Sequence, residues 1–116
     1  MISRAGASSV AELAAAGRAA ILVPLPNATD DHQTANAKQL ADIGGGVYHA
    51  QHELNAAKLA AEITCLFGDA EQLARMGRNA RKLAMPDAAR KIADYALSLC
   101  DDNKKQLAQR ISGGQL

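Results

Sequence analysis

Apolar residues follow two patterns, with short continuous runs in the first half of the chain and a helical spacing in the second. Residues 20–23 are four consecutive apolar residues between Gly17 and Pro24, which is typical of a strand buried on both faces. Residues 2–3 have the character of the end of a strand, and residues 46–49 predict a third short strand. The first half therefore predicts three short strands.

Helical patterns separate these strands. Ser9 and Glu12 have the spacing of a capping box, which predicts a helix start at Ser9, and Gly17 is suited to end that helix. Residues 33–43 predict a second helix, with Ala37 and Leu40 on its apolar stripe. The order strand, helix, strand, helix, strand predicts a parallel sheet with right-handed crossovers, and so an α/β fold.

The second half is helix-rich. Breaks at residues 68–69 and 85–87 divide it into three helical segments, and Pro86 is placed as a helix-start residue. The three apolar stripes are Leu59, Ile63, Leu66 and Phe67; Leu73, Met76, Ala80 and Leu83; and Ala89, Ile92, Ala96 and Leu99. The polar residues 101–105 predict fraying, and residues 112–116 predict a disordered tail. We therefore expect one domain over residues 1–100 and a polar, partly disordered extension over residues 101–116.

Composition supports a small helix-rich domain. The 116 residues include 26 alanines but only three aromatic residues, so the packed layers should be thin. A net charge of +1 argues against a nucleic-acid partner, and no apolar run is long enough to span a membrane. The N-terminus lacks the pattern of a signal peptide, which predicts a cytoplasmic protein. Cys65 and Cys100 lie in apolar helical patterns and are expected to be reduced core thiols.

The most informative segment for chemistry is the turn that leads from the first strand into the first helix. Free backbone N–H groups and the helix dipole favour an anion such as phosphate at this position. Gly6 lets the backbone bend and a ligand approach, while Ser8 and Ser9 offer hydroxyl donors. Glu12, one turn further on, suits the vicinal hydroxyls of a ribose. A purely structural role in the turn and the cap remains open at this point, because the segment is neither a P-loop nor a G-x-G-x-x-G fingerprint.

A second polar segment follows the second predicted strand and so opens onto the same edge of the sheet. Gln33 and Asn36 are three residues apart on the next helix and share a face, and their amides suit sugar hydroxyls. The alternative is a polar first turn with Asp30 or Asp31 as the N-cap.

The remaining polar residues favour neither metal nor nucleophilic chemistry. His32, His49 and His52 have no second ligand at a suitable spacing, so we expect no metal site. A basic helical stripe formed by Arg75, Arg78 and Lys82 is expected to be a solvated face, with anionic lipid headgroups or a partner as alternatives.

Four stretches together closely resemble the C-terminal domain of the family 28 glycosyltransferases. They are SRAGASSVAELAAAG at residues 3–17, AILVPL at 20–25, DHQTANA at 31–37 and MPDA at 85–88. The resemblance covers about residues 2–100, and the spacing between the first and third stretches is its most specific feature. It implies a partial Rossmann-like parallel sheet with flanking helices, which is the C-terminal half of a GT-B enzyme.

The resemblance also implies an activity. Enzymes of this kind move N-acetylglucosamine from UDP-GlcNAc to lipid I, with inversion, to form lipid II for peptidoglycan, and they need no cofactor. The implied donor contacts come from the 7–9 turn for the diphosphate, Glu12 for the ribose and Gln33 for the sugar. The full set of implied UDP-GlcNAc-binding residues is Ala7, Ser8, Ser9, Val10, Ala11, Glu12 and Gln33, with Gly6, His32 and Asn36 as further candidates.

The resemblance leaves some of the family's parts without a counterpart. The acceptor-binding N-terminal domain and the earlier strands of the C-terminal domain are not matched here, so we assign no catalytic residue. We expect this chain to be a C-terminal piece that is inactive alone, with lipid I and peripheral contact with the cytoplasmic face of the membrane belonging to the intact enzyme. Two alternatives remain, a non-catalytic UDP-sugar-binding or partner-docking module and, less favoured, an isomerase resembling the UDP-GlcNAc 2-epimerases.

Overall fold

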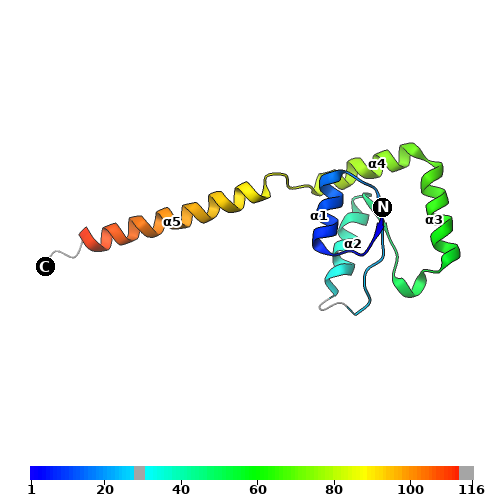
Figure 1. The fold of residues 1–116 in the computed structure, drawn as a ribbon, viewed down its shortest axis with the longest axis horizontal. Helices are drawn as coiled ribbons and strands as arrows, with labels where there is room; N and C mark the ends of the chain where they lie inside the picture. The colour runs from blue at the N-terminus through cyan, green and yellow to red at the C-terminus, as the bar shows by residue number, and fades with distance from the viewer. Residues whose placement is uncertain (28–30, 113–116) are drawn as a thin grey trace. The chain divides into compact units, whose positions relative to one another are not determined.

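The computed structural model describes residues 1–27 and 31–112, with side chains through residue 100. It divides into two compact units, Met1–Ala84 and Met85–Leu116. The first unit contains the sheet and four of the α-helices (Figure 1). The strands and α-helices are β1 (Ile2–Ser3), α1 (Ala7–Ala16), β2 (Ala20–Leu22), α2 (His32–Asp42), β3 (Gly46–Tyr48), α3 (Ala56–Gly68) and α4 (Ala70–Ala80). Two short 3₁₀ helices, η2 (Gln51–Glu53) and η3 (Arg81–Leu83), follow β3 and α4. In the second unit the structure describes one long helix, α5 (Ala88–Ser112).

The three strands form a parallel sheet in the order β1-β2-β3, which confirms the predicted α/β fold. Ile21 at the centre of β2 pairs with Ile2 on one side and Val47 on the other. Backbone hydrogen bonds continue just beyond the strands, from the N–H of Val23 to the carbonyl of Ser3 and from the N–H of His49 to the carbonyl of Leu22. Because all three strands run the same way, the loops that follow them emerge at one edge.

Both faces of β2 are buried because its side chains alternate between two layers of helices. Ala20 and Leu22 join one apolar core together with residues of α1 and α2. Ile21 joins a second core, with Leu66 of α3 and Met76 of α4. Figure 1 shows α1 and α2 lying next to each other and α3 joined end to end with α4. The apolar run at 20–22 is thus explained by burial on two sides.

Two helix starts differ from the prediction. α1 begins at Ala7 with Gly6 as its N-cap, so Ser9 lies in the first turn and the predicted capping box does not form. The Ser9–Glu12 spacing was misleading because any two residues three apart in a helix share a face. α5 begins at Ala88, two residues after Pro86, and it continues through residues 101–105 without the predicted fraying. The tail residues 113–116 lie outside the described residues.

The prediction of buried thiols is wrong. Cys65 and Cys100 are both exposed, and neither forms a disulfide. In the stripe predicted for α3, Leu66 is buried but Phe67 is 80% exposed, so only part of the apolar sequence meets the sheet. Ile92 and Leu99 of α5 are also exposed. A helical apolar pattern shows which face of a helix is apolar, but the presence of a covering partner decides burial.

Small residues set the distance between the layers at the end of α4. A Cβ atom placed on Gly77 would lie 2.4 Å from the carbonyl oxygen of Gly17, in the turn that ends α1. A Cβ on Gly45 would lie 2.9 Å from backbone atoms of Ala80. Backbone atoms cannot move aside as a flexible side chain can, so α4 needs glycine at these contacts.

We therefore expect Gly77→Ala to destabilise the chain by about 1–3 kcal/mol, because the added methyl group forces α4 away from the Gly17 turn. Gly68→Ala is the matched control, since nothing lies within 4 Å of a Cβ there. The control should change the free energy of unfolding by less than about 0.5 kcal/mol or raise it slightly. Urea unfolding monitored by circular dichroism measures both, and equal effects of the two variants would contradict the close contact.

Candidate functional site

The turn between β1 and α1 places a helix N-terminus at the carboxyl edge of the sheet. The first hydrogen bond of α1 runs from the N–H of Val10 to the carbonyl of Gly6, at 3.0 Å. The N–H groups of Ala7, Ser8 and Ser9 therefore have no partner within the helix. No side chain caps α1, and its first turn contains no acidic residue. The end of this helix is thus a set of backbone donors with the positive end of the dipole behind them.

The polar side chains of α1 lie close together on the surface of the helix. Glu12 is four residues after Ser8 and three after Ser9, so the three side chains are neighbours on the helix surface. Ser8 and Glu12 are exposed and Ser9 is half-buried. Val10, by contrast, is 7% exposed and belongs to the core. Its N–H donates to the carbonyl of Gly6, so its side chain packs in the core and its amide is used within the helix.

Gly6 does not have the backbone role that was expected of it. Its φ of −61° and ψ of 151° are ordinary extended values, so the bend does not require glycine. A Cβ atom at Gly6 would meet only the hydroxyl of Ser9, at 3.8 Å. The glycine that the backbone does require is Gly17, which ends α1 with a φ of 60°. Neither the backbone angles nor the space at residue 6 therefore explains a glycine there.

Gln33 and Asn36 both point from α2 toward the loops at this edge. The Oε1 atom of Gln33 accepts a hydrogen bond from the N–H of Leu25 at 2.9 Å. The Nδ2 atom of Asn36 donates to the carbonyl of Ala5 at 3.1 Å. The bond to Gln33 uses its carbonyl oxygen only, so the amide Nε2 atom is not engaged by it. The two amides share a face of α2 as predicted, and their side chains bond to two different loops.

α2 begins at His32, after the N-cap residue Asp31. Asp31 has left-handed backbone angles, and its side chain forms no capping bond, so the predicted carboxylate cap at this position does not form. Asp30, the other candidate cap, lies outside the described residues. His32 is exposed at the first position of the helix. The structure therefore places the four polar candidates Ser9, Glu12, Gln33 and Asn36 on two helices that meet the same sheet edge.

Arg4 is the residue of this edge that the sequence did not single out. Its Nη1 atom donates to the carbonyls of Val23 and Pro24, each at 3.2 Å, and to Oε1 of Gln51 at 2.7 Å. These partners are 19, 20 and 47 residues away along the chain. One guanidinium group therefore connects the end of β1 to the loops that follow β2 and β3. Only the fact that Arg4 directly follows β1 at the carboxyl edge could have suggested this role.

A groove of about 330 Å³ continues the edge beyond α2. It is bordered by the loop after β2, the first turns of α2 and the residues after β3. The lining residues are Pro24, Leu25, Pro26, Asp31, Thr34, Lys38, Tyr48, Ala50, Gln51 and His52. Its mixed polar and apolar lining is suited to a polar organic ligand.

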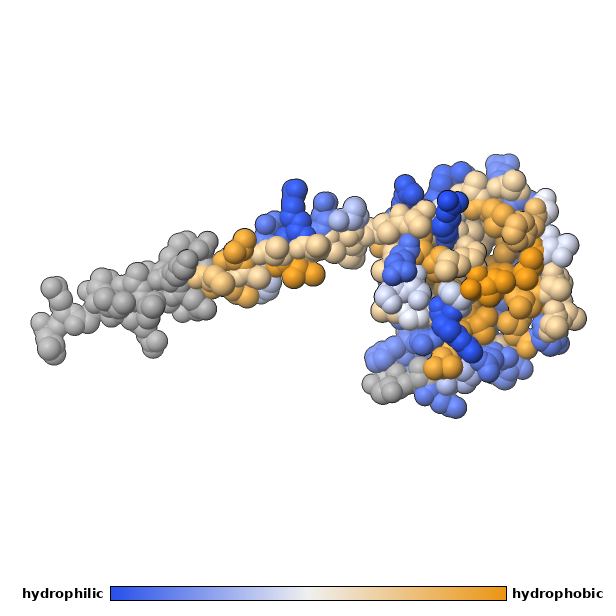
Figure 2. Space-filling view, in the orientation of Figure 1, coloured by the Kyte–Doolittle hydropathy of each residue, from blue (hydrophilic) through white to orange (hydrophobic). Residues whose placement is uncertain are grey.

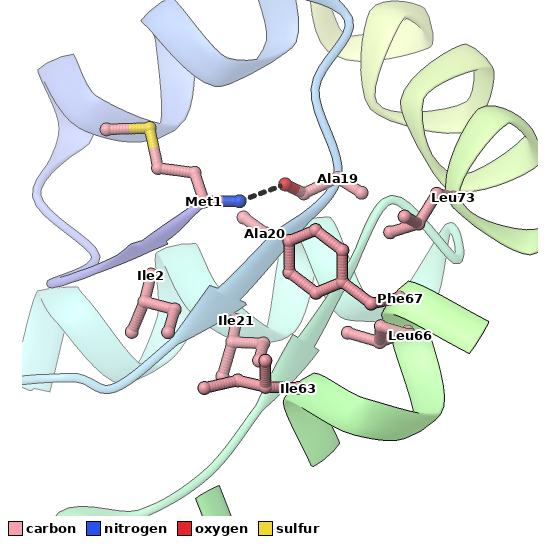
Figure 3. Close-up of a pocket in the computed structure, with 9 residues that line it drawn as sticks. All are labelled: Met1, Ile2, Ala19, Ala20, Ile21, Ile63, Leu66, Phe67 and Leu73. Atoms are coloured by element: carbon pink, nitrogen blue, oxygen red, sulfur yellow. Dashed lines mark hydrogen bonds between the residues drawn. The ribbon is translucent and has the colours of Figure 1, made fainter. Parts of the chain in front are cut away.

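A separate apolar cavity of about 320 Å³ lies between the sheet and α3 (Figure 3). Ile2 and Ile21 line it from the strands, and Ile63 and Phe67 line it from α3. The only hydrogen bond drawn there joins the amino group of Met1 to the carbonyl of Ala19, at 2.8 Å. Figure 2 shows hydrophobic residues gathered on this side of the unit. The side chains that line the cavity are all apolar, and we assign it no chemistry.

Neither a metal site nor a membrane span is found in the part of the chain that the structure describes. Among the residues whose side chains are described, 1–27 and 31–100, there is no group of three or more His, Cys, Asp or Glu residues that could hold a metal ion. None of the described helices is both long and apolar enough to cross a membrane. His49 instead contacts Glu62, at 3.3 Å.

The sequence matches known proteins over most of its length. Residues 1–92 match the profile of the glycosyltransferase family 28 C-terminal domain. A protein of Rhodospirillum centenum is 54% identical over 97 residues, which are 84% of this chain and 26% of that protein. A protein of Alkalilimnicola ehrlichii is 54% identical over 96 residues, or 83% and 27% of the two chains. Both are named UDP-N-acetylglucosamine–N-acetylmuramyl-(pentapeptide) pyrophosphoryl-undecaprenol N-acetylglucosamine transferase.

A solved structure agrees with these relatives. The crystal structure of MurG from Acinetobacter baumannii superposes with a TM-score of 0.75 and 46% sequence identity, over 81% of this chain and 27% of that chain. This chain thus spans about a quarter of the length of the relatives it matches. The family match covers the sheet, the α1 turn and the Gln33 segment together, so the chain belongs to glycosyltransferase family 28, through that family's C-terminal domain.

Proposed function

We propose that this chain is the donor-binding part of an N-acetylglucosamine transferase that uses UDP-GlcNAc. The observation that carries the proposal is the uncapped N-terminus of α1 at the carboxyl edge of the sheet. Ligands of open parallel α/β sheets bind in the crevice at this edge. The names of the relatives supply the reaction, which is transfer of N-acetylglucosamine to a pyrophosphoryl-undecaprenol acceptor.

The diphosphate is assigned to the first turn of α1. The N–H groups of Ala7, Ser8 and Ser9 donate to its oxygens, and the two serine hydroxyls add further donors. The positive end of the helix dipole favours the charge of the ligand, and no acidic residue in the first turn opposes it. Ala11 is exposed on the same helix beside Glu12, whereas Val10 contributes through the core behind the turn.

Glu12 and Gln33 are assigned to the two sugars. The carboxylate of Glu12 can accept two hydrogen bonds from the vicinal hydroxyls of the ribose. Gln33 keeps its amide donors for the hydroxyls of N-acetylglucosamine, because Leu25 already uses its carbonyl oxygen. That bond also fixes the rotation of the Gln33 amide, so the side chain is oriented before the ligand binds.

Binding at these points favours the transfer step. The acceptor hydroxyl attacks the anomeric carbon, the new C–O bond forms, and the bond from that carbon to the UDP oxygen breaks with inversion. Negative charge grows on the leaving phosphate, and donors already aimed at it stabilise that charge. Holding the diphosphate and ribose also orients the reacting carbon. We assign the base that removes the hydroxyl proton to no residue of this chain.

We propose that the enzyme as a whole binds the acceptor, lipid I. Because this acceptor is a lipid, the enzyme as a whole should also contact the cytoplasmic face of the membrane peripherally. For the chain alone we propose donor binding without turnover. Purified chain incubated with UDP-GlcNAc and lipid I should release no UDP. Formation of lipid II by the chain alone would contradict the assignment of a donor-side role.

Titration calorimetry with UDP-GlcNAc tests the donor site. We expect Glu12→Gln to weaken binding about tenfold, since hydrogen bonds to a charged group contribute about 1.5–3 kcal/mol. Glu71→Gln, at another exposed helical glutamate, is the matched control and should change the dissociation constant less than twofold. Equal binding by wild-type chain and Glu12→Gln would remove Glu12 from the site.

Gly6→Ala and Gly17→Ala should separate ligand binding from stability. Gly6→Ala fits its backbone angles, so the free energy of unfolding should change by less than about 0.5 kcal/mol. Its methyl group would stand beside the first turn of α1 and should weaken UDP-GlcNAc binding about tenfold by crowding the diphosphate. Gly17→Ala should show the opposite, because residue 17 has a φ of 60° and a Cβ would lie 2.7 Å from Nε of Arg81.

Thermal melts measure the stability of each variant, and calorimetry on the same samples measures its affinity for UDP-GlcNAc. Gly17→Ala should lose about 1 kcal/mol or more of stability and bind UDP-GlcNAc normally at a temperature where it is folded. Unchanged affinity in Gly6→Ala would place the ligand away from the α1 turn.

A further inference from the structure

We propose that Asn36 is a positioning residue that holds the β1–α1 turn in the geometry needed for the diphosphate. This inference rests on the proposed function, and it assigns to Asn36 a role that does not require contact with the ligand. The structure shows the side chain already engaged, with its Nδ2 atom donating to the carbonyl of Ala5 at 3.1 Å.

The bond acts on the peptide that leads into α1. Ala5 is fully buried and directly precedes Gly6, the N-cap of the helix. The Ala5 carbonyl and the Gly6 N–H belong to one planar peptide unit, so a bond to that carbonyl fixes the plane of the unit. The N–H groups of the first helical turn follow immediately. Their direction therefore depends on how the Ala5–Gly6 peptide is held.

No other described contact at this turn replaces the bond from Asn36. α1 has no side-chain cap, and the hydroxyl of Ser3 donates to the neighbouring carbonyl of Arg4 instead. Arg4 reaches away from the turn, toward Val23, Pro24 and Gln51. Asn36 lies 31 positions after Ala5 in the sequence, on α2, so its hydrogen bond links the turn to a separate helix.

The same helix face also positions the proposed sugar contact. Gln33 lies one turn before Asn36 and accepts a bond from the N–H of Leu25. α2 is thereby bonded through two amides to the loops after β1 and after β2. Asn36 thus fixes the separation between the donors of α1 and the amide of Gln33. A ligand with a diphosphate joined to a sugar requires such a fixed separation.

Asn79 provides a matched control for a purely structural role. Its Nδ2 atom also donates to a backbone carbonyl far away in sequence, that of Gly44, at 3.4 Å. Gly44 precedes β3, so this bond lies at the amino edge of the sheet, opposite the proposed site. Asn36→Ala and Asn79→Ala therefore remove the same kind of bond at opposite edges.

The test measures UDP-GlcNAc binding by calorimetry in both variants, well below their melting temperatures. We expect Asn36→Ala to weaken binding about tenfold, which corresponds to the upper range of one hydrogen bond, and Asn79→Ala to change it less than twofold. In ligand-free ¹H–¹⁵N spectra, the amide signals of residues 6–9 should shift in Asn36→Ala but not in Asn79→Ala. Asn36→Leu, which keeps the volume without the donor, serves if the alanine variant does not fold.

The outcomes separate this inference from the proposed function. If the wild-type chain does not bind UDP-GlcNAc, the proposed function fails and this inference fails with it. If the wild-type chain binds but Asn36→Ala binds equally well, the inference alone is overturned. Equal losses of affinity in Asn36→Ala and Asn79→Ala would also overturn it, because a general loss of packing would then explain both.

Discussion

The parallel pairing of β2 with both of its neighbours determines where the helices and the candidate site lie. β2 is only three residues long, yet all three are buried and each pairs with a residue of β3. Its alternating side chains hold one helical layer on each face, through Leu22 on one side and Ile21 on the other. Because all strands point the same way, the turns after β1, β2 and β3 gather at one edge. The proposed site is a consequence of that gathering.

The alanine-rich composition is explained by how closely the layers approach the sheet. Among the residues whose burial is described, five of the buried apolar residues are alanines, namely Ala5, Ala14, Ala20, Ala37 and Ala80. Helices packed through alanine and glycine come near enough for backbone to touch backbone, as Gly77 does with Gly17. Such contacts tolerate little change in volume. The positions of α1 and α2, and with them the candidate site, are therefore set with little freedom.

Long-range hydrogen bonds then refine the edge that the sheet creates. Arg4, which follows β1, bonds to the loop after β2, and Asn36 of α2 bonds to the loop after β1. Gln33 bonds to the loop that leads into its own helix. These bonds hold the loops of the edge in place, and none of them caps the N-terminus of α1. The free N–H groups of a helix end are normally satisfied by capping side chains, solvent or a ligand, so an uncapped end at the carboxyl edge of a parallel sheet favours an anionic ligand.

The sequence predicted the elements of the fold better than their boundaries and contacts. The strands at residues 20–22 and 46–48 could be predicted because a short apolar run next to glycine or proline is typical of a buried strand. The start of α1 was misplaced because Ser9 and Glu12 imitate a capping box, and local spacing cannot distinguish a cap from a first turn. Cys65 was expected in the core because its apolar neighbours suggested a covered face.

Only part of the candidate site could be predicted from the sequence. The α1 turn, Glu12 and Gln33 could be located from the order of strands and helices. The bonds of Arg4 and Asn36 could not, because their partners are 19 to 47 residues away and meet them only after the sheet forms.

An NMR titration of the ¹⁵N-labelled chain with UDP-GlcNAc would locate the ligand residue by residue and so decide whether the α1 turn binds the donor. We predict saturable shifts that are largest for the amides of Ala7, Ser8 and Ser9, with further shifts at Glu12 and the side-chain amide of Gln33. Shifts centred on Ile63 and Phe67 at the apolar cavity, or no saturable shift at millimolar ligand, would contradict a donor site at this turn.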